Sequence, residues 1–200
     1  MTKLYENCQR MVNIAFTNEM ADACLPHGID PYEVASAAAT KPFGFMDFRP
    51  SVGVGGHCIP VNPWYLLGNC EFPLLKKAAE TMASRPEEIA KREVEKLERE
   101  VVGRRTRVLV VGIGFKKGQG VVSYSPGVAL ARALAERGVD VMWADPLVEQ
   151  EVVPEVQRLE ESEWGSQLVR FDVIIVVVKQ IGLDFGVLDR LEGVRIEMWA

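Results

Sequence analysis

One glycine-rich segment of the chain places a histidine beside a cysteine. It reads Ser-Val-Gly-Val-Gly-Gly-His-Cys-Ile-Pro-Val-Asn over residues 51–62. Because glycine has no Cβ, the backbone here can approach a ligand closely and present His57 and Cys58 to it. A thiol attacks as the thiolate, so a nucleophilic Cys58 requires a nearby cation or helix N-terminus. The alternative is that Cys58 is a small buried apolar residue, as lone cysteines more often are.

Two polar residues near the N-terminus could supply the activating groups. Lys3 and Asn7 are four positions apart, so they share one face of the helix expected there. The alternative is that both side chains are merely solvated and that His57 is only a polar loop residue.

The cysteines and histidines form no pattern typical of a metal site or a disulfide framework. The cysteines are irregularly spaced without a Cys-x-x-Cys pair, and the chain has only two histidines, so no metal is expected. The N-terminal residues lack the apolar stretch of a secretory signal, so we expect free thiols and a cytoplasmic location. These residues are Cys8, Cys24, Cys58, Cys70, His27 and His57.

Length and charge exclude several classes of protein. A chain of 200 residues suits one domain with a smaller partner, or one large domain. It has 23 Lys and Arg against 28 Asp and Glu, a formal charge of −5, which provides no basic face for nucleic acid. The longest apolar run, residues 173–178, is far below the roughly 20 residues of a membrane helix.

The first hundred residues are expected to begin with two helices. Apolar residues at three- and four-residue spacing predict a helix over residues 3–25. Asp30 followed by Pro31 is typical of a cap that begins a second helix. The buried stripe expected for the first helix consists of Leu4, Cys8, Met11, Val12, Ala15, Phe16, Met20 and Leu25.

Glycine and proline residues then interrupt any regular spacing of apolar residues, which predicts a long loop over residues 40–63. Loops of that length in a compact domain are usually functional. A helix is expected over residues 74–82. Ser84 and Pro86 are expected to restart the chain as a cap for a largely solvent-facing helix over residues 87–100.

From residue 103 onward apolar strands alternate with helices. The domain boundary is therefore predicted there, giving parts 1–102 and 103–200. Ser125 and Pro126 are expected to cap and begin a helix that ends before Gly138. The sequence predicts an α/β protein: an all-helical dimerisation module followed by a doubly wound, Rossmann-like parallel sheet. Its strands are expected at residues 107–112, 139–143, 171–178 and 194–198.

Gly112 and Gly114 after the first of these strands suggest a dinucleotide-binding turn, with Asp145 as the ribose-binding acid. In that fingerprint the third glycine would stand at position 117, which is lysine, and no helix is expected before Ser125. The pyrophosphate then has no helix N-terminus to bind. We therefore expect a nucleotide-shaped fold that holds another ligand or none, rather than NAD.

Several separated motifs together resemble the UDP-glucose/GDP-mannose dehydrogenase family, and among its members the N-acetylhexosamine 6-dehydrogenases most. The likeness covers essentially the whole chain and corresponds to the central and C-terminal domains of the family. The motifs of the first half are Lys3-Leu-x-x-Asn7, Val12-Asn-Ile-Ala15, Gly28-Ile-Asp30, Ala-Ala-Ala-Thr-Lys-Pro-Phe-Gly-Phe over 37–45, and Gly53-x-Gly-Gly-His-Cys-Ile-Pro. Those of the second half are Gly112-x-Gly-Phe-Lys-Lys117, Ser125-Pro126 and Asp145-Pro146.

This resemblance implies a chemistry. Members of the family oxidise the C6 alcohol of a nucleotide sugar to a carboxylate in two NAD-dependent steps, through thiohemiacetal and thioester intermediates on a cysteine. By resemblance Cys58 is that nucleophile, Lys3 stabilises the oxyanion and Asn7 is its hydrogen-bonding companion. The resemblance also implies a nucleotide-sugar ligand and a homodimer formed through the central helices. The expected substrate-binding residues are Gly53, Gly55, Gly56, His57, Phe45 and Lys116.

The sequence also departs from the family pattern. Asn62 stands where the family has an aspartate four residues after the cysteine, and an amide cannot act as the base that a carboxylate provides. Val121 and Ser123 stand where an acid and an arginine help to hold the UDP-sugar, and loss of a guanidinium weakens diphosphate binding. The NAD-binding domain of the family precedes the helix with which this sequence begins, and the late Asp-Gly-Arg of the family would follow Ala200.

These departures favour one hypothesis over two others. The preferred one is a shortened relative that is incapable of redox chemistry, with no cofactor, whose pocket around Cys58 performs non-redox catalysis such as isomerisation or cyclisation. The second is part of a genuine NAD-dependent UDP-sugar 6-dehydrogenase whose cofactor domain is missing or supplied by another chain. The third is a non-enzymatic dimeric scaffold.

Overall fold

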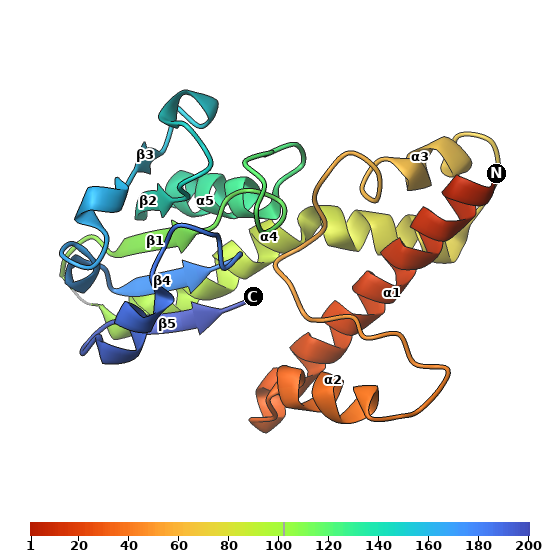
Figure 1. Ribbon diagram of the computed structural model, residues 1–200, viewed down its shortest axis with the longest axis horizontal. Coiled ribbons are helices and arrows are strands. Elements are labelled where there is room, and N and C mark those ends of the chain that lie inside the picture. Colours follow the sequence, from red (N-terminus) through yellow and green to blue (C-terminus); the bar gives the residue numbers. More distant parts are fainter. Residues whose placement is uncertain (102) are drawn as a thin grey trace.

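The computed structural model describes residues 1–101 and 103–200. Two long helices, α1 (Thr2–Cys24) and α4 (Pro73–Glu100), form the frame of the first half, and a parallel sheet forms the second (Figure 1). A short helix, α3 (Asn62–Leu67), lies beside the N-terminal end of α1, and α2 (Pro31–Ala39) lies against its C-terminal half (Figure 1). None of the described helices has the length and apolarity needed to cross a bilayer.

Helix α1 confirms the first predicted helix, but only part of its predicted stripe is buried. Cys8, Met11 and Ala15 pack against α4 in one apolar cluster. Phe16 and Met20 are 63% and 44% exposed, so the prediction that they are buried is wrong. A helix presents one apolar stripe to each neighbour, and α4 covers only one side of α1. Leu25, also expected to be buried, is exposed in a short 3₁₀ turn, Leu25–His27.

Helix α2 begins as predicted. Its cap residue Asp30 accepts a hydrogen bond from the Tyr32 N–H at 2.8 Å, and Pro31 occupies the first turn. Helix α3, in contrast, begins at Asn62, inside the range predicted as loop. Pro63 in its first turn fits a helix start, because proline there removes an N–H that has no helical partner.

The two helices predicted over residues 74–82 and 87–100 are the single helix α4, with Pro86 in its interior. Proline lacks the N–H that would donate to the carbonyl of Met82, and this carbonyl faces Gly53 instead, 3.5 Å from where a Cβ would lie. That distance is an ordinary van der Waals contact, so the freed carbonyl does not itself require a glycine at position 53.

The second part of α4 is largely exposed, as expected, but it also has a buried stripe. Ile89, Ala90 and Leu97 are buried in the core shared with the sheet. These residues form a narrow apolar stripe at helical spacing, which the surrounding charged residues obscure in the sequence.

Five parallel strands form the sheet in the order β3-β2-β1-β4-β5, which confirms the α/β class. The strands are β1 (Arg107–Val111), β2 (Asp140–Ala144), β3 (Gln157–Arg158), β4 (Val173–Val176) and β5 (Arg195–Met198). Four of them match predicted strands, and the two-residue β3 was not predicted. The central strand β1 pairs with β2 on one side and with β4 on the other.

The two faces of the sheet are covered differently. Helix α5 (Pro126–Glu136) connects β1 to β2 and packs with α4 on one face, where Val108 and Val110 point. The side chain of Ser125 caps α5 by accepting the Val128 N–H at 3.4 Å, as predicted. The opposite face carries Leu109 and is covered by loops and short 3₁₀ helices (Figure 1). The predicted domain boundary falls at residue 102, outside the described residues, and stays a prediction.

Candidate functional site

The loop that carries Cys58 lies between α1 and the loop that follows β1. On one side, Ile59 packs against the apolar cluster formed by Cys8 and Met11 of α1. On the other side, the Gly56 N–H donates to the carbonyl of Ser123 at 2.9 Å. The long loop predicted around Cys58 is therefore fixed from both sides rather than free.

The glycines of this loop allow close contact with the α/β half of the protein. A Cβ on Gly55 would lie 2.7 Å from the Cβ of Phe115 and 2.9 Å from Pro126. Gly56 has φ of +89°, and a Cβ there would lie 2.8 Å from the Phe115 ring. Gly53 in the same way meets Pro126 at 3.2 Å. The space beside these glycines is filled by the protein itself, and their contact with a substrate stays a prediction.

Cys58 carries a free, half-buried thiol at the turn into α3. Its carbonyl accepts the N–H groups of Val61 at 3.2 Å and Asn62 at 2.9 Å, which fixes the backbone of the turn. The adjacent His57 is exposed. Among the other thiols, burial raises the pKa of Cys8 and so favours its neutral form.

Asn62, the first residue of α3, is buried, with 8% of its surface exposed. Its side-chain nitrogen Nδ2 has no hydrogen-bond partner among the described residues. Buried polar groups are nearly always paired, because an unpaired donor costs about 1–3 kcal/mol. An unpaired amide donor therefore stands four residues after the free thiol of Cys58.

Lys3 and Asn7 belong to the N-terminal half of α1, the helix against which α3 packs. Asn7 is buried and Lys3 is exposed. Within residues 1–101 and 103–200, no side-chain hydrogen bond or ion pair connects either residue to Cys58 or Asn62. Their catalytic roles stay predictions.

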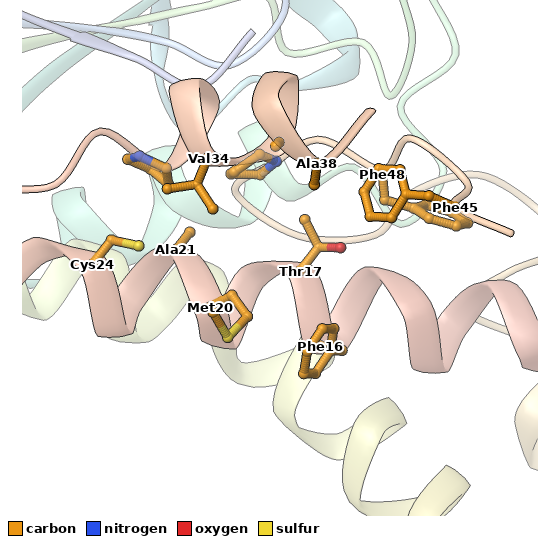
Figure 2. Close-up of a pocket in the computed structure, with 12 residues that line it drawn as sticks. Phe16, Thr17, Met20, Ala21, Cys24, Val34, Ala38, Phe45 and Phe48 are labelled. Atoms are coloured by element: carbon orange, nitrogen blue, oxygen red, sulfur yellow. The ribbon is translucent and has the colours of Figure 1, made fainter. Parts of the chain in front are cut away.

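Phe45 and Lys116 are two further residues predicted to bind substrate. Phe45 lines an apolar cleft between α1 and α2, together with Phe16 and Phe48 (Figure 2). Lys116 is exposed in the loop after β1, where its carbonyl accepts the Gln119 N–H. The structure therefore places Cys58 and Asn62 on one turn, and Phe45 in a cleft that Cys58 does not line.

The turn after β1 does not fit a dinucleotide. Helix α5 begins only at Pro126, as predicted, and the Asp145 carboxylate accepts backbone N–H groups from Gly114 at 2.9 Å and Leu147 at 3.0 Å. An acid engaged in this way is not free to bind a ribose hydroxyl. Sequence reasoning missed Gln180, which is buried beside Asp145 and accepts the Gly118 N–H at 2.6 Å. No cluster of metal-ligating side chains occurs in the described part of the chain.

Comparison with known proteins identifies the family. A family model, "UDP-glucose/GDP-mannose dehydrogenase family, central domain", matches residues 1–82. The chain belongs to this dehydrogenase family. A UDP-N-acetyl-D-mannosamine dehydrogenase of Campylobacter jejuni is 29% identical over 191 residues, 88% of this chain and 46% of that protein. A UDP-N-acetyl-D-glucosamine 6-dehydrogenase of Pseudomonas aeruginosa is 37% identical over 164 residues, 74% of this chain and 36% of that protein.

Solved structures agree with the fold. A UDP-D-ManNAc dehydrogenase from Pyrococcus horikoshii superimposes with a TM-score of 0.82 at 24% identity, covering 100% of this chain and 51% of that one. A UDP-glucose dehydrogenase from Pyrobaculum islandicum gives a TM-score of 0.76 at 26% identity, covering 99% of this chain and 46% of that one. The chain thus spans about half the length of these dehydrogenases or less.

The residues predicted to depart from the dehydrogenase family pattern lie around the Cys58 loop. Val121 and Ser123 belong to the loop that crosses Gly56, and their carbonyls accept N–H groups from Phe115 and Gly56 respectively. Asn62 is the buried residue of α3 described above. The structure therefore places the predicted departures beside a free cysteine on a fixed loop.

Proposed function

We propose that this chain carries the thiol site of a nucleotide-sugar 6-dehydrogenase, in which Cys58 adds to the C6 carbonyl of the sugar. One observation carries the proposal: the free, half-buried thiol of Cys58 is followed four residues later by the buried, unpaired amide donor of Asn62. The named relatives, which act on N-acetylated nucleotide sugars by their names, support this substrate class.

The proposed step is an addition that needs no oxidant. The Cys58 sulfur forms a bond to the carbonyl carbon, the π electron pair moves to the oxygen, and that oxygen takes up a proton to give a thiohemiacetal. Donors aimed at the developing oxyanion accelerate such a step, and the roles proposed for Lys3, Asn7 and the Asn62 amide are to donate to it. Because the turn after β1 does not fit NAD, the proposal includes no hydride transfer at that turn.

A second candidate shares this addition but uses the adduct for non-redox catalysis of the isomerase or cyclase type. The observation that favours it is Asn62 itself, since a buried amide cannot take the proton that a carboxylate at this position would accept. We also propose a cytoplasmic location, because all four cysteines are free and thiols stay reduced there.

The test uses a UDP-N-acetylhexosamine 6-aldehyde labelled with ¹³C at C6. We expect the protein to produce a thiohemiacetal carbon resonance distinct from those of the free aldehyde and its hydrate. Cys58→Ser should abolish the resonance, and Cys70→Ser, at the exposed thiol, should keep it. A resonance that survives Cys58→Ser, or none with the unaltered protein, would refute the proposal. Formation of the carboxylate with added NAD would support the dehydrogenase function. Formation of an isomerised or cyclised sugar without NADH would support the second candidate.

We further propose that the protein is a homodimer through the face formed by α1 and α2. Phe16, Met20 and Val34 surround an apolar cleft of about 180 Å³ on this face and are largely exposed in the single chain (Figure 2). Contiguous exposed apolar groups of this kind mark interaction surfaces.

Phe16→Glu is expected to raise the dimer dissociation constant at least tenfold, which corresponds to about 1.4 kcal/mol, because it buries a carboxylate in that face. Sedimentation velocity over a concentration series measures it. Tyr5→Glu is the matched control: Tyr5 is an equally exposed aromatic residue of α1 that lines a different cleft, beside α4. Equal weakening by both variants, or a monomeric parent protein, would contradict this dimer face.

A further inference from the structure

The glycine-rich loop begins at Ser51, and the backbone of this residue is bound by two buried side chains. The Ser51 N–H donates to Asn18 Oδ1 of α1 at 2.8 Å. The Ser51 carbonyl accepts from Arg85 Nε of α4 at 2.9 Å. Asn18 is fully buried, and Arg85 is only 4% exposed. Two helices distant in sequence therefore fix the first residue of the loop that leads to Cys58.

Arg85 is itself fixed on its remaining sides. Its two terminal nitrogens donate to the Asp22 carboxylate at 2.6 Å and 3.1 Å, and its guanidinium stacks over the ring of Trp199 at 5.6 Å. Burial acts to raise the pKa of Asp22, but the charges and hydrogen bonds of Arg85 and Arg92 outweigh it and lower that pKa. The planar fork of arginine makes all these contacts at once, which a lysine ammonium cannot do.

A third side chain secures the residue just before Ser51. The Tyr32 hydroxyl lies 3.3 Å from the carbonyl of Pro50 and 3.2 Å from that of Met198, at the end of β5. Burial, together with the charge of Asp30, raises the pKa of Tyr32 to about 12, so its hydroxyl stays a donor throughout the neutral range. The start of the loop thus contacts α1, α2, α4 and the sheet.

We propose that Arg85, with Asn18, is a positioning residue for the Cys58 thiol. The segment between Ser51 and Cys58 contains three glycines, which by themselves allow many backbone conformations. It is fixed at its start by Asn18 and Arg85, in its middle by the bond from Gly56 to Ser123, and at its end by the turn into α3. Val52 and Val54 also pack against the apolar clusters, so releasing Ser51 weakens the hold on the segment without abolishing it, and Cys58 leaves its half-buried position more often. This inference rests on the proposed function, because positioning the thiol matters only if Cys58 reacts. Its test does not depend on that function.

The test compares alkylation rates of the thiols by iodoacetamide, followed by peptide mass spectrometry well below the melting temperature. Arg85→Lys keeps the charge but loses the fork, and we expect it to raise the rate at Cys58 at least fivefold relative to that at exposed Cys70. Arg92→Gln is the matched control, because Arg92 pairs with Asp22 at 3.1 Å but does not bind Ser51. Its rate ratio should stay within twofold of the unaltered protein.

Selective exposure of Cys58 distinguishes positioning from general loss of structure, since buried Cys8 should stay protected. If Arg85→Lys unfolds and exposes Cys8, the test relies on Asn18→Ala, which removes the other bond to Ser51. We expect this variant to raise the alkylation rate at Cys58 by the same factor of at least five. An unchanged ratio in the folded variant, or an equal change in Arg92→Gln, would overturn the inference. Because alkylation needs no nucleotide sugar, a changed ratio with no aldehyde adduct would refute the proposed function and leave the positioning role intact.

Discussion

Gly112→Ala is expected to destabilise the protein by about 3–5 kcal/mol, among the largest effects of any single methyl group. Gly112 has φ of +77°, a conformation that costs an L-residue roughly 1–2 kcal/mol. In addition, its Cβ would lie 2.0 Å from the carbonyl oxygen of Val178. That carbonyl belongs to the backbone leaving β4, the strand paired with β1, so it cannot move away without disturbing the centre of the sheet.

Gly138→Ala is the control that separates these two contributions. Gly138 has φ of +84°, but no atom lies within 4 Å of where its Cβ would be. Only the conformational cost of about 1–2 kcal/mol is expected there. Equilibrium denaturation by urea, followed by circular dichroism, measures both variants. Equal losses of stability would show that the close approach to Val178 contributes nothing.

The elements of the fold that a sequence predicts well are those with a clear period and a clear cap. The continuous apolar run of β1 and the Ser125–Pro126 start of α5 were both predicted correctly. The continuity of α4 was not, because Pro86 normally ends a helix, whereas here the turns on both sides of it pack into apolar clusters. β3 has only two residues, too few to show any period.

The residues of the candidate site also divide into those that a local sequence pattern reveals and those that it does not. Cys58 and its glycines were found because a motif is a local pattern, and the family to which they pointed is confirmed. Asn18, Arg85 and Gln180 were missed, because each acts on a backbone group far away in the sequence. Arg85 in particular lies in a charged stretch that is typical of a solvated surface, and only the packing of α1 against α4 shows that it is buried. For Asn18 and Arg85 the one sequence signal is polarity on an otherwise apolar helix stripe, which does not name a partner. Gln180 lies in the loop after β4 and has no such signal.

Asp145→Ala is expected to cost about 2–4 kcal/mol of folding free energy. The side chain is 1% exposed and accepts the N–H groups of Gly114 and Leu147, so its removal leaves two buried donors unpaired. Asp140→Ala is the matched control, at the start of β2, whereas Asp145 directly follows the end of that strand. Its carboxylate is about half exposed and pairs with Arg107, an arrangement worth about 1 kcal/mol or less. Urea denaturation of the two variants measures the difference.

Asp145→Asn tests why a carboxylate is needed at this position. The two oxygens of Asp145 each accept one backbone N–H, whereas an asparagine offers one oxygen and one nitrogen that is itself a donor. Gln180 cannot compensate, because its own oxygen accepts from Gly118 and its nitrogen donates to the Gln119 carbonyl at 3.2 Å. Asp145→Asn should therefore recover no more than about half of the free energy of unfolding that Asp145→Ala loses. Full restoration would show that only one of the two bonds matters, and would leave the other oxygen of Asp145 free for a ligand.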